Sequence, residues 1–206
     1  MSDPRKALAG LGVSRETIGR LEIYAGLLTR WQARINLVGP DTLPDLWTRH
    51  ILDSAQLWPL LPPEARRLAD LGSGAGFPGL VLAILGAPDV HLVESDARKC
   101  AFLREAARLT GTTVTILNRR IEQVEPLGAD IVTARALAPL SRLLDWAAPH
   151  LGPGGQCLFL KGRGAEDELT ATAKEWKIGH RRIRSLTDPE GVVLQLREVC
   201  RGSAQH

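Results

Sequence analysis

The sequence predicts an α/β protein with a doubly wound, mostly parallel sheet of seven strands and an N-terminal helical extension. Two observations support this prediction. From Arg66 onward, short apolar runs alternate with helical stretches, which is typical of parallel strands joined by crossover helices. Before about residue 64, apolar residues recur only at helical spacing. We therefore predict an extension at 1–64 that packs on a core domain at 65–206.

The extension contains two predicted helices. The first begins at Ser14, a residue type that caps helix N-termini, and ends at Gly39-Pro40. The second runs from Pro44 to Trp58, where a proline-rich stretch stops it. The apolar face of the first helix consists of Ile18, Leu21, Ala25, Leu28, Trp31 and Ile35.

The core domain is predicted to alternate strands and helices. The predicted strands are 67–71, 90–94, 113–117, 129–133, 156–160, 182–186 and 192–199. One predicted helix begins at about residue 78, and three others span 96–109, 139–151 and 166–176. A Thr-Asp-Pro-Glu-Gly turn joins the last two strands, so we expect a hairpin at one sheet edge. The glycine-rich stretch 152–155 is predicted to be a turn.

The composition narrows the class of protein. With 44% apolar and 24% charged residues it is ordinary for a globular domain. Three cysteines and five histidines show no metal-ligand spacing, and the odd cysteine count predicts reduced thiols. The net charge of +3, carried mainly by arginine, permits a nucleic-acid partner without demonstrating one. The sequence shows neither a signal peptide nor a membrane-spanning run, so we expect a cytoplasmic protein. We also expect a monomer that binds no metal.

A glycine-rich loop, Asp-Leu-Gly-Ser-Gly-Ala-Gly-Phe-Pro-Gly at 70–79, follows the first core strand and opens a helix. Glycine lets a backbone turn sharply and approach a ligand closely. In doubly wound folds this position binds nucleotides. Glu94 ends the second strand, where a carboxylate can accept hydrogen bonds from ribose hydroxyls.

Two kinds of cofactor are compatible with this loop. The stretch 74–79 fits the Gly-x-Gly-x-x-Gly dinucleotide fingerprint, whereas Asp70 stands two residues before a Gly-x-Gly-x-Gly run, as in S-adenosylmethionine loops. Asp70 favours the second, because a carboxylate repels a pyrophosphate but attracts a sulfonium or ammonium group. A tight turn without a ligand is the third alternative. We predict cofactor contacts at Asp70, Gly72, Gly74 and Glu94.

Further short motifs accompany the loop in a fixed order. They are Asn-Leu-Val at 36–38, Arg-His-Ile-Leu-Asp-Ser at 49–54, Leu-Val-Glu-Ser at 92–95, Arg-Ile-Glu at 120–122, Arg-Ala at 135–136 and Lys-Gly at 161–162. With the loop, this set resembles the ribosomal small-subunit RNA guanine-N7 methyltransferase family, also called glucose-inhibited division protein B. The resemblance runs from about Ile35 to Gly162.

The resemblance implies a class I S-adenosylmethionine-dependent methyltransferase that modifies N7 of guanine 527 in 16S rRNA. It implies cofactor contacts at Gly72 and Phe77 in the loop, at Ile121 and Glu122 after the third strand, and at Arg135 after the fourth. Phe77 departs slightly from the family, in which an aliphatic residue is common at this position.

The sequence agrees with this chemistry. Guanine N7 has a free lone pair and no proton, so its methylation needs alignment and electrostatics but no general base. The chain lacks both the Asn/Asp-Pro-Pro-aromatic motif of amino-methylating enzymes and a Pro-Cys nucleophile. Arg135 is the expected catalytic residue, as an anchor for the cofactor carboxylate or for guanine O6 that leaves N7 free. An ordinary surface arginine is the alternative.

Basic residues outside the loop are candidates for RNA contacts. Arg49 and His50 are expected to cap the cofactor cleft or touch RNA, with plain helix packing as the alternative. Lys161 is expected to pair with phosphate or to be an ordinary solvated lysine. Arg182 and Arg184 share one side of a predicted strand, which either faces RNA or is a solvated sheet edge.

Two other classes of function remain open at this level. A nucleotide-dependent oxidoreductase would bind NAD, and a non-catalytic RNA-binding module with a vestigial pocket would bind RNA without turnover. The intact loop and Glu94 argue against a vestigial pocket. We therefore expect S-adenosylmethionine as cofactor, S-adenosylhomocysteine as product, and 16S rRNA or the small ribosomal subunit as partner.

Overall fold

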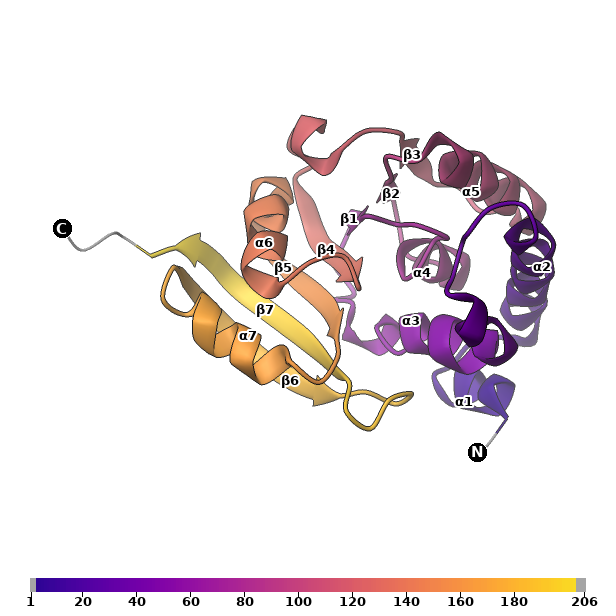
Figure 1. The fold of residues 1–206 in the computed structure, drawn as a ribbon, viewed down its shortest axis with the longest axis horizontal. Helices are drawn as coiled ribbons and strands as arrows, with labels where there is room; N and C mark the ends of the chain where they lie inside the picture. Colours follow the sequence, from indigo (N-terminus) through magenta and orange to yellow (C-terminus); the bar gives the residue numbers. More distant parts are fainter. Residues whose placement is uncertain (1–2, 203–206) are drawn as a thin grey trace.

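The computed structural model describes residues 3–202 and has the predicted α/β architecture (Figure 1). The strands are β1 (Leu68–Leu71), β2 (Val90–Val93), β3 (Thr115–Leu117), β4 (Ala129–Arg135), β5 (Leu151–Lys161), β6 (Trp176–Arg184) and β7 (Val192–Arg201). The helices are α1 (Pro4–Gly10), α2 (Arg15–Gln32), α3 (Asp53–Ala55), α4 (Gly79–Leu85), α5 (Ala97–Thr110), α6 (Leu140–Ala147) and α7 (Ala165–Thr172).

The strands form one seven-stranded sheet in the order β3-β2-β1-β4-β5-β7-β6. The first five strands pair in parallel, whereas β7 runs antiparallel to both β5 and β6. The predicted hairpin and sheet are therefore confirmed. The order reverses between β1 and β4, and doubly wound folds bind ligands outside the carboxyl ends of the strands at such a reversal.

Helices cover both faces of the sheet (Figure 1). On one face, Leu80 of α4 and Phe102 of α5 belong to a buried cluster that also contains Leu21 of α2. On the other face, Leu143 of α6 and Leu169 of α7 pack with the sheet in a second cluster. The sheet is thus buried on both sides, and its carboxyl edge is left for a site.

The N-terminal extension packs directly on the core domain. Tyr24 of α2 is fully buried, and its hydroxyl donates to the carbonyl of Ala75 in the glycine loop at 2.6 Å. Arg20 donates to the carbonyl of Thr110 at the end of α5 at 2.8 Å. Ser14 accepts from the Thr17 amide at 3.1 Å, which confirms the predicted N-cap. The boundary at residue 64 stays a prediction.

The first predicted helix begins correctly at Ser14 but extends too far at its C-terminal end, and a further helix precedes it. The short helix α1 lies before Ser14 and was not predicted. At the other end, α2 stops at Gln32 instead of Gly39. The Gln32 side chain accepts from the amides of Leu37 and Val38 at 3.0 and 3.1 Å. This side chain replaces the next helical turn and bends the chain towards the sheet.

The second predicted helix, from Pro44 to Trp58, is wrong as a continuous element. The structure has a 3-10 segment (Pro40–Asp45), a π-helical turn (Trp47–Leu52) and then α3. Pro44 lies inside the 3-10 segment, and proline removes the N–H that a regular α-helix would use. The π-helical turn carries Arg49 and His50 to the carboxyl edge of the sheet.

β6 begins earlier than predicted, whereas β7 begins at Val192 as predicted. β6 starts at Trp176, six residues before the predicted strand, and its register shifts between Lys177 and Gly179. That irregularity breaks the alternation from which strands are predicted. The stretch 152–155, predicted as a turn, bulges within β5, because pairing passes from Ala129–Leu151 to Ile131–Gln156.

Gly79 should be essential for packing α4 on the sheet. An added Cβ would lie 2.5 Å from Cβ of Asp70 and 2.6 Å from Cδ2 of Leu92. Gly79→Ala should therefore lower the free energy of unfolding by about 1–3 kcal/mol, as overpacking does. Gly19 in α2 is the matched control, because its Cβ would meet nothing within 4 Å. Gly19→Ala should stabilise by roughly 0.5–1 kcal/mol in the same urea titration, and equal effects of the two changes would contradict the packing argument.

Candidate active site

The glycine loop has the left-handed backbone that its sequence requires. Gly72, Gly74 and Gly76 have φ angles of +66°, +56° and +100°. A Cβ on Gly76 would lie 2.7 Å from Cβ of Leu80, so the loop folds tightly against the start of α4. Gly74 has open space where a side chain would stand, with only the Gly72 carbonyl oxygen at 3.8 Å.

Glu94 follows β2 directly and lies beside this loop. Its Oε2 accepts from the Gly74 amide at 2.8 Å, and its Oε1 accepts from the Asp96 amide at 2.7 Å. The residue is 8% exposed. The structure therefore brings together a carboxylate and the most open glycine of the loop.

Asp70 lies deeper in the protein than a residue that contacts a bound cofactor directly. It is fully buried at the carboxyl end of β1, and its Oδ1 accepts from the Thr133 hydroxyl at 2.7 Å. Among the residues that the structure describes, none donates to its Oδ2. Burial raises the pKa of this carboxyl to about 6, opposed mainly by the hydrogen bond from Thr133. An incompletely satisfied buried acceptor behind the loop suits a cationic ligand in front of it.

Ile121 and Glu122 lie on a 3-10 turn (Ile121–Gln123) in the segment after β3. Ile121 is half-buried, and Glu122 is exposed. One oxygen of Glu122 accepts from the Trp146 indole at 2.9 Å and lies 3.4 Å from the Arg142 guanidinium. Both contacts come from α6, so Glu122 joins the segment after β3 to that helix.

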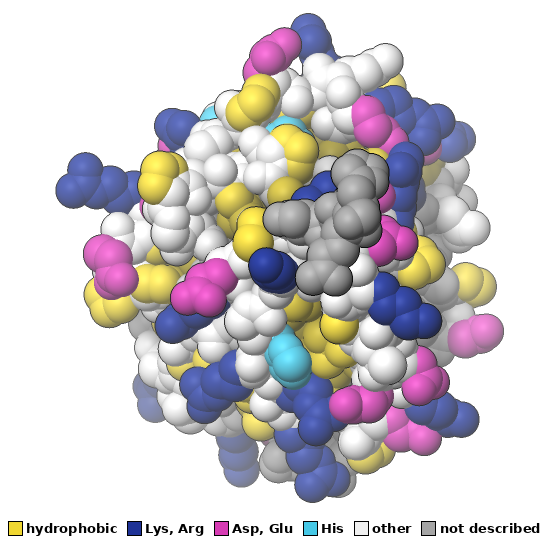
Figure 2. Space-filling model, turned by 90° about the vertical axis from the view of Figure 1, so that its left-hand side faces the viewer, with side chains coloured by type: hydrophobic (Ala, Val, Ile, Leu, Met, Phe, Trp, Pro, Cys, Tyr) yellow, Lys and Arg dark blue, Asp and Glu magenta, His cyan; other side chains and the backbone are white. Residues whose placement is uncertain are grey.

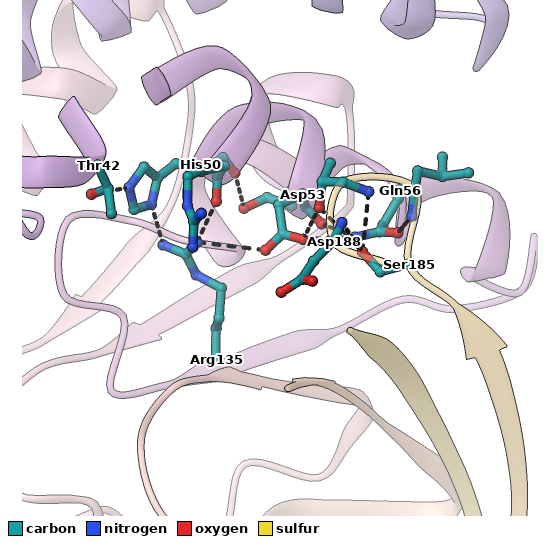
Figure 3. Close-up of polar contacts among 11 residues, drawn as sticks. Thr42, His50, Asp53, Gln56, Arg135, Ser185 and Asp188 are labelled. Atoms are coloured by element: carbon teal, nitrogen blue, oxygen red, sulfur yellow. Dashed lines mark hydrogen bonds and ion pairs between the residues drawn. The ribbon is translucent and has the colours of Figure 1, made fainter. Parts of the chain in front are cut away.

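Arg135 ends β4 and is held by groups from the extension (Figure 3). Its Nη1 donates to the Arg49 carbonyl at 3.0 Å and lies 3.5 Å from Oδ2 of Asp53. Its Nη2 lies 2.8 Å from Nδ1 of His50. The guanidinium carbon lies 4.9 Å from the centre of the Phe77 ring. The side chain is only 18% exposed, so Arg135 is not an ordinary surface arginine.

His50 is buried and uncharged at neutral pH. Burial lowers its pKa to about 4, helped by the positive charges of Arg135 and Arg49. Because Nδ1 accepts from Arg135, Nε2 carries the proton and donates to Thr42 Oγ1 at 2.8 Å. The Thr42 hydroxyl donates in turn to the Gly39 carbonyl at 2.7 Å. This chain of bonds ties the loop after α2 to the end of β4.

Two hollows flank the Arg135–Asp53 pair, with volumes of about 340 and 320 Å³. The first is also lined by Leu37, Val38, Gly39, Thr42, Arg49 and His50. The second is also lined by Leu160, Lys161, Gly162, Arg163, Ser185 and Gly191. The guanidinium therefore borders both spaces.

The other basic candidates lie apart from this centre. Lys161 pairs with Glu168 at 2.7 Å and donates to the Ala138 carbonyl at 3.0 Å, and its side chain is only 11% exposed. Arg182 and Arg184 are exposed on β6, and Arg182 pairs with Glu166 of α7. Figure 2 shows basic and acidic side chains interspersed on the face that carries the C-terminal hairpin.

Three residues of this region were missed from the sequence. Asp53 pairs with Arg135, and the Thr187 hydroxyl donates to Oδ1 of Asp53 at 2.6 Å. Leu137 covers Gly72, since a Cβ there would lie 2.6 Å from Cδ1 of Leu137. Only Asp53 lies in a motif that the sequence singled out.

The sheet order, the antiparallel β7, the loop after β1 and the acid ending β2 define a class I S-adenosylmethionine-dependent methyltransferase fold. The crystal structure of ribosomal protein L11 methylase from Lactobacillus delbrueckii subsp. bulgaricus has a similar fold. Its TM-score is 0.59 at 19% identity, and the match covers 74% of this chain and 78% of that chain.

A family model described as GidB, rRNA small subunit methyltransferase G, matches residues 17–191. A relative with the name ribosomal RNA small subunit methyltransferase G, from Paramagnetospirillum magneticum, is 74% identical over 98% of each chain. Another with that name, from Rhodospirillum rubrum, is 54% identical over 96% of this chain and 98% of its own. The chain therefore belongs to the GidB family, which confirms the resemblance and favours a methyltransferase over the other two classes of function.

None of the helices described within 3–202 has the length and apolar character needed to cross a membrane. In the same residues, no three His, Cys, Asp or Glu side chains are grouped as a metal site.

Replacing Asp70 with Asn tests the buried carboxyl. Its pKa is raised from the ordinary 3.8 to about 6, so between these values the folded state keeps a proton that the unfolded state has lost. Asp70 therefore lowers stability as the pH rises through this window, by on the order of 1–3 kcal/mol. Asp70→Asn keeps an oxygen for Thr133 and should remove that loss.

Urea unfolding of both proteins between about pH 4 and 8 measures the effect. The difference in unfolding free energy should change in favour of Asp70→Asn as the pH rises, mainly below about pH 6. A difference that is constant with pH would show that Asp70 titrates normally.

Proposed function

We propose that this protein transfers a methyl group from S-adenosylmethionine to N7 of guanine 527 in 16S rRNA, releasing S-adenosylhomocysteine. The observation that carries the proposal is the placement of Glu94, the glycine loop and Arg135 along one carboxyl edge of the sheet. Membership of the GidB family supports ribosomal RNA as the substrate. The position of the guanine follows from the motif resemblance.

The residues at this edge fit the proposed cofactor. Glu94 is suited to ribose hydroxyls, and the backbone of Gly72 and Gly74 to close approach. Ile121, Glu122 and Phe77 are proposed as further contacts. When bound, S-adenosylmethionine supplies an electrophilic methyl group on a positively charged sulfur. Asp70 is proposed to favour that charge from behind the loop, since it has no exposed surface.

Methylation at N7 suits the groups around Arg135. Guanine N7 has a lone pair and no proton, so no side chain has to remove one. His50 is not arranged as a base, because its Nδ1 already accepts from Arg135 and its Nε2 donates to Thr42. Arg135 is proposed to anchor guanine O6 or the cofactor carboxylate through a charge-assisted hydrogen bond.

We propose that RNA approaches from the side of the two hollows. Arg49 is exposed beside one of them, and His50 lines it. Lys161 lines the other, where it orders the segment after β4 through the Ala138 carbonyl. Arg182 and Arg184 on the edge strand are proposed as phosphate contacts farther away. The protein is expected to act as a monomer in the cytoplasm, on 16S rRNA or the small subunit.

The nature of the attacking atom can be tested directly. The protein should methylate undermodified 16S rRNA, or small subunits that contain it, at guanine 527, as mapped by mass spectrometry of nuclease fragments. RNA with 7-deazaguanine at that position keeps the pairing edge but has no N7 lone pair. It should bind with unchanged affinity and accept no methyl group. Methyl transfer to the 7-deaza RNA would show that another atom is the nucleophile.

Glu94→Gln tests the cofactor. A glutamine keeps the size of the side chain but places an amide NH₂ against one of two backbone donors and removes the charge. Calorimetry should show roughly 10–100-fold weaker binding of S-adenosylmethionine, as expected for losing hydrogen bonds to a charged group. Glu105→Gln on α5, where Glu105 pairs with Arg108 alone among the described residues, should bind normally. Tight NAD binding, or equal affinity in both variants, would overturn the assignment.

A further inference from the structure

The turn between β6 and β7 is fastened to the N-terminal extension at the carboxyl edge of the sheet. The Gln56 side chain donates to Ser185 Oγ at 3.3 Å and accepts from the Leu186 amide at 2.8 Å. The Thr187 hydroxyl donates to Oδ1 of Asp53 at 2.6 Å. Figure 3 shows Asp53 and Gln56 on the helical segment facing Ser185 across this junction. Two segments distant in the chain therefore meet beside the candidate active site.

Asp53 links this turn to Arg135. Its Oδ1 accepts from Thr187 and, at 2.9 Å, from the Gln56 side chain, while its Oδ2 lies 3.5 Å from Nη1 of Arg135. The Asp53 side chain is 16% exposed. Burial raises its pKa, against the lowering effects of Thr187 and Arg135. The Thr187 hydroxyl thus orients the Asp53 carboxylate, and this carboxylate in turn orients the Arg135 guanidinium.

The remaining contacts of Arg135 restrict its plane without using all of its donors. Arg49 and His50 accept from Nη1 and Nη2, and the Phe77 ring lies against the group. A guanidinium has five N–H donors. Within the described residues no hydrogen bond uses its Nε, so donors remain for a ligand in the adjoining hollows.

We infer that Asp53 and Thr187 are positioning residues, forming a bridge that holds Arg135 at the angle needed for methyl transfer. The inference rests on the proposed function, in which Arg135 contacts the guanine or the cofactor. Small displacements of a positioned group lower rates strongly, by up to about 100-fold for 1 Å. The bridge makes the β6–β7 turn a part of the active site.

Single substitutions distinguish a loss of the bridge from a loss of fold stability. Thr187→Val keeps the shape of the side chain but removes its donor, and should lower kcat by about 3–10-fold, with KM for RNA, cofactor affinity and Tm nearly unchanged. Thr187→Ser restores a hydroxyl and should return kcat to within about twofold of the wild type. Thr170→Val, on α7, removes a hydroxyl whose one bond within residues 3–202 is to the Glu166 carbonyl, and it should be neutral.

A double-mutant cycle tests whether Thr187 acts through Asp53. Asp53→Asn removes the charge facing Arg135 and should lower kcat more than Thr187→Val does. If the two residues form one bridge, adding Thr187→Val to Asp53→Asn should have little further effect. Multiplicative losses in the double variant would overturn the inference, as would wild-type kcat in Thr187→Val or a failure of serine to rescue.

A measurement without catalysis distinguishes this inference from the proposed function. Histidine side-chain ¹⁵N spectra should show His50 neutral, with the proton on Nε2 and with Nδ1 accepting a hydrogen bond. Thr187→Val should move the Nδ1 resonance towards that of a free acceptor as Arg135 loosens, and Thr170→Val should not. An unmoved resonance would count against the bridge. A wild-type protein that leaves guanine 527 unmethylated would refute the proposed function, while this spectrum would still decide the bridge.

Discussion

The carboxyl edge of the sheet is organised around a positive charge with little access to water. Arginine cannot shed its proton in a protein, so neighbouring groups must satisfy it. The Arg135 guanidinium obtains a carbonyl from Arg49, a ring nitrogen from His50 and a carboxylate from Asp53. Arg49 and His50 lie in the π-helical turn, and Asp53 begins α3 directly after it. The irregular path of the extension thus places the groups that satisfy the Arg135 guanidinium at the end of β4.

The sequence predicted those elements whose signals are local. The alternation of apolar runs located β1, β2 and β4 within a residue or two at most boundaries, and Ser14 marked the start of α2 correctly. The failures lie where distant contacts outweigh local pattern. The Gln32 side chain ended a helix whose periodicity continued, and a shifted register hid the first six residues of β6.

The candidate site was predictable to the extent that it followed strand ends. Glu94 and Gly74 were both predicted as cofactor contacts because they follow the first two core strands, and in the structure they share a hydrogen bond. Thr187 had no such signal, since 134 positions separate it from the Asp53 carboxylate that it contacts. The depth of Asp70 was also hidden, because a motif gives the order of residues but not which of them α4 covers.

The position of β7 constrains the order in which the sheet can form while the chain is being synthesised. This strand follows β6 along the chain, yet it lies between β5 and β6 in the sheet. A nascent chain that has not yet exposed residues 192–201 therefore has a β5 with one unpaired side, and unpaired strand edges recruit other chains. The glycine loop and its neighbours precede β7 along the chain, so the far edge of the sheet can close only after residues 192–201 have left the ribosome.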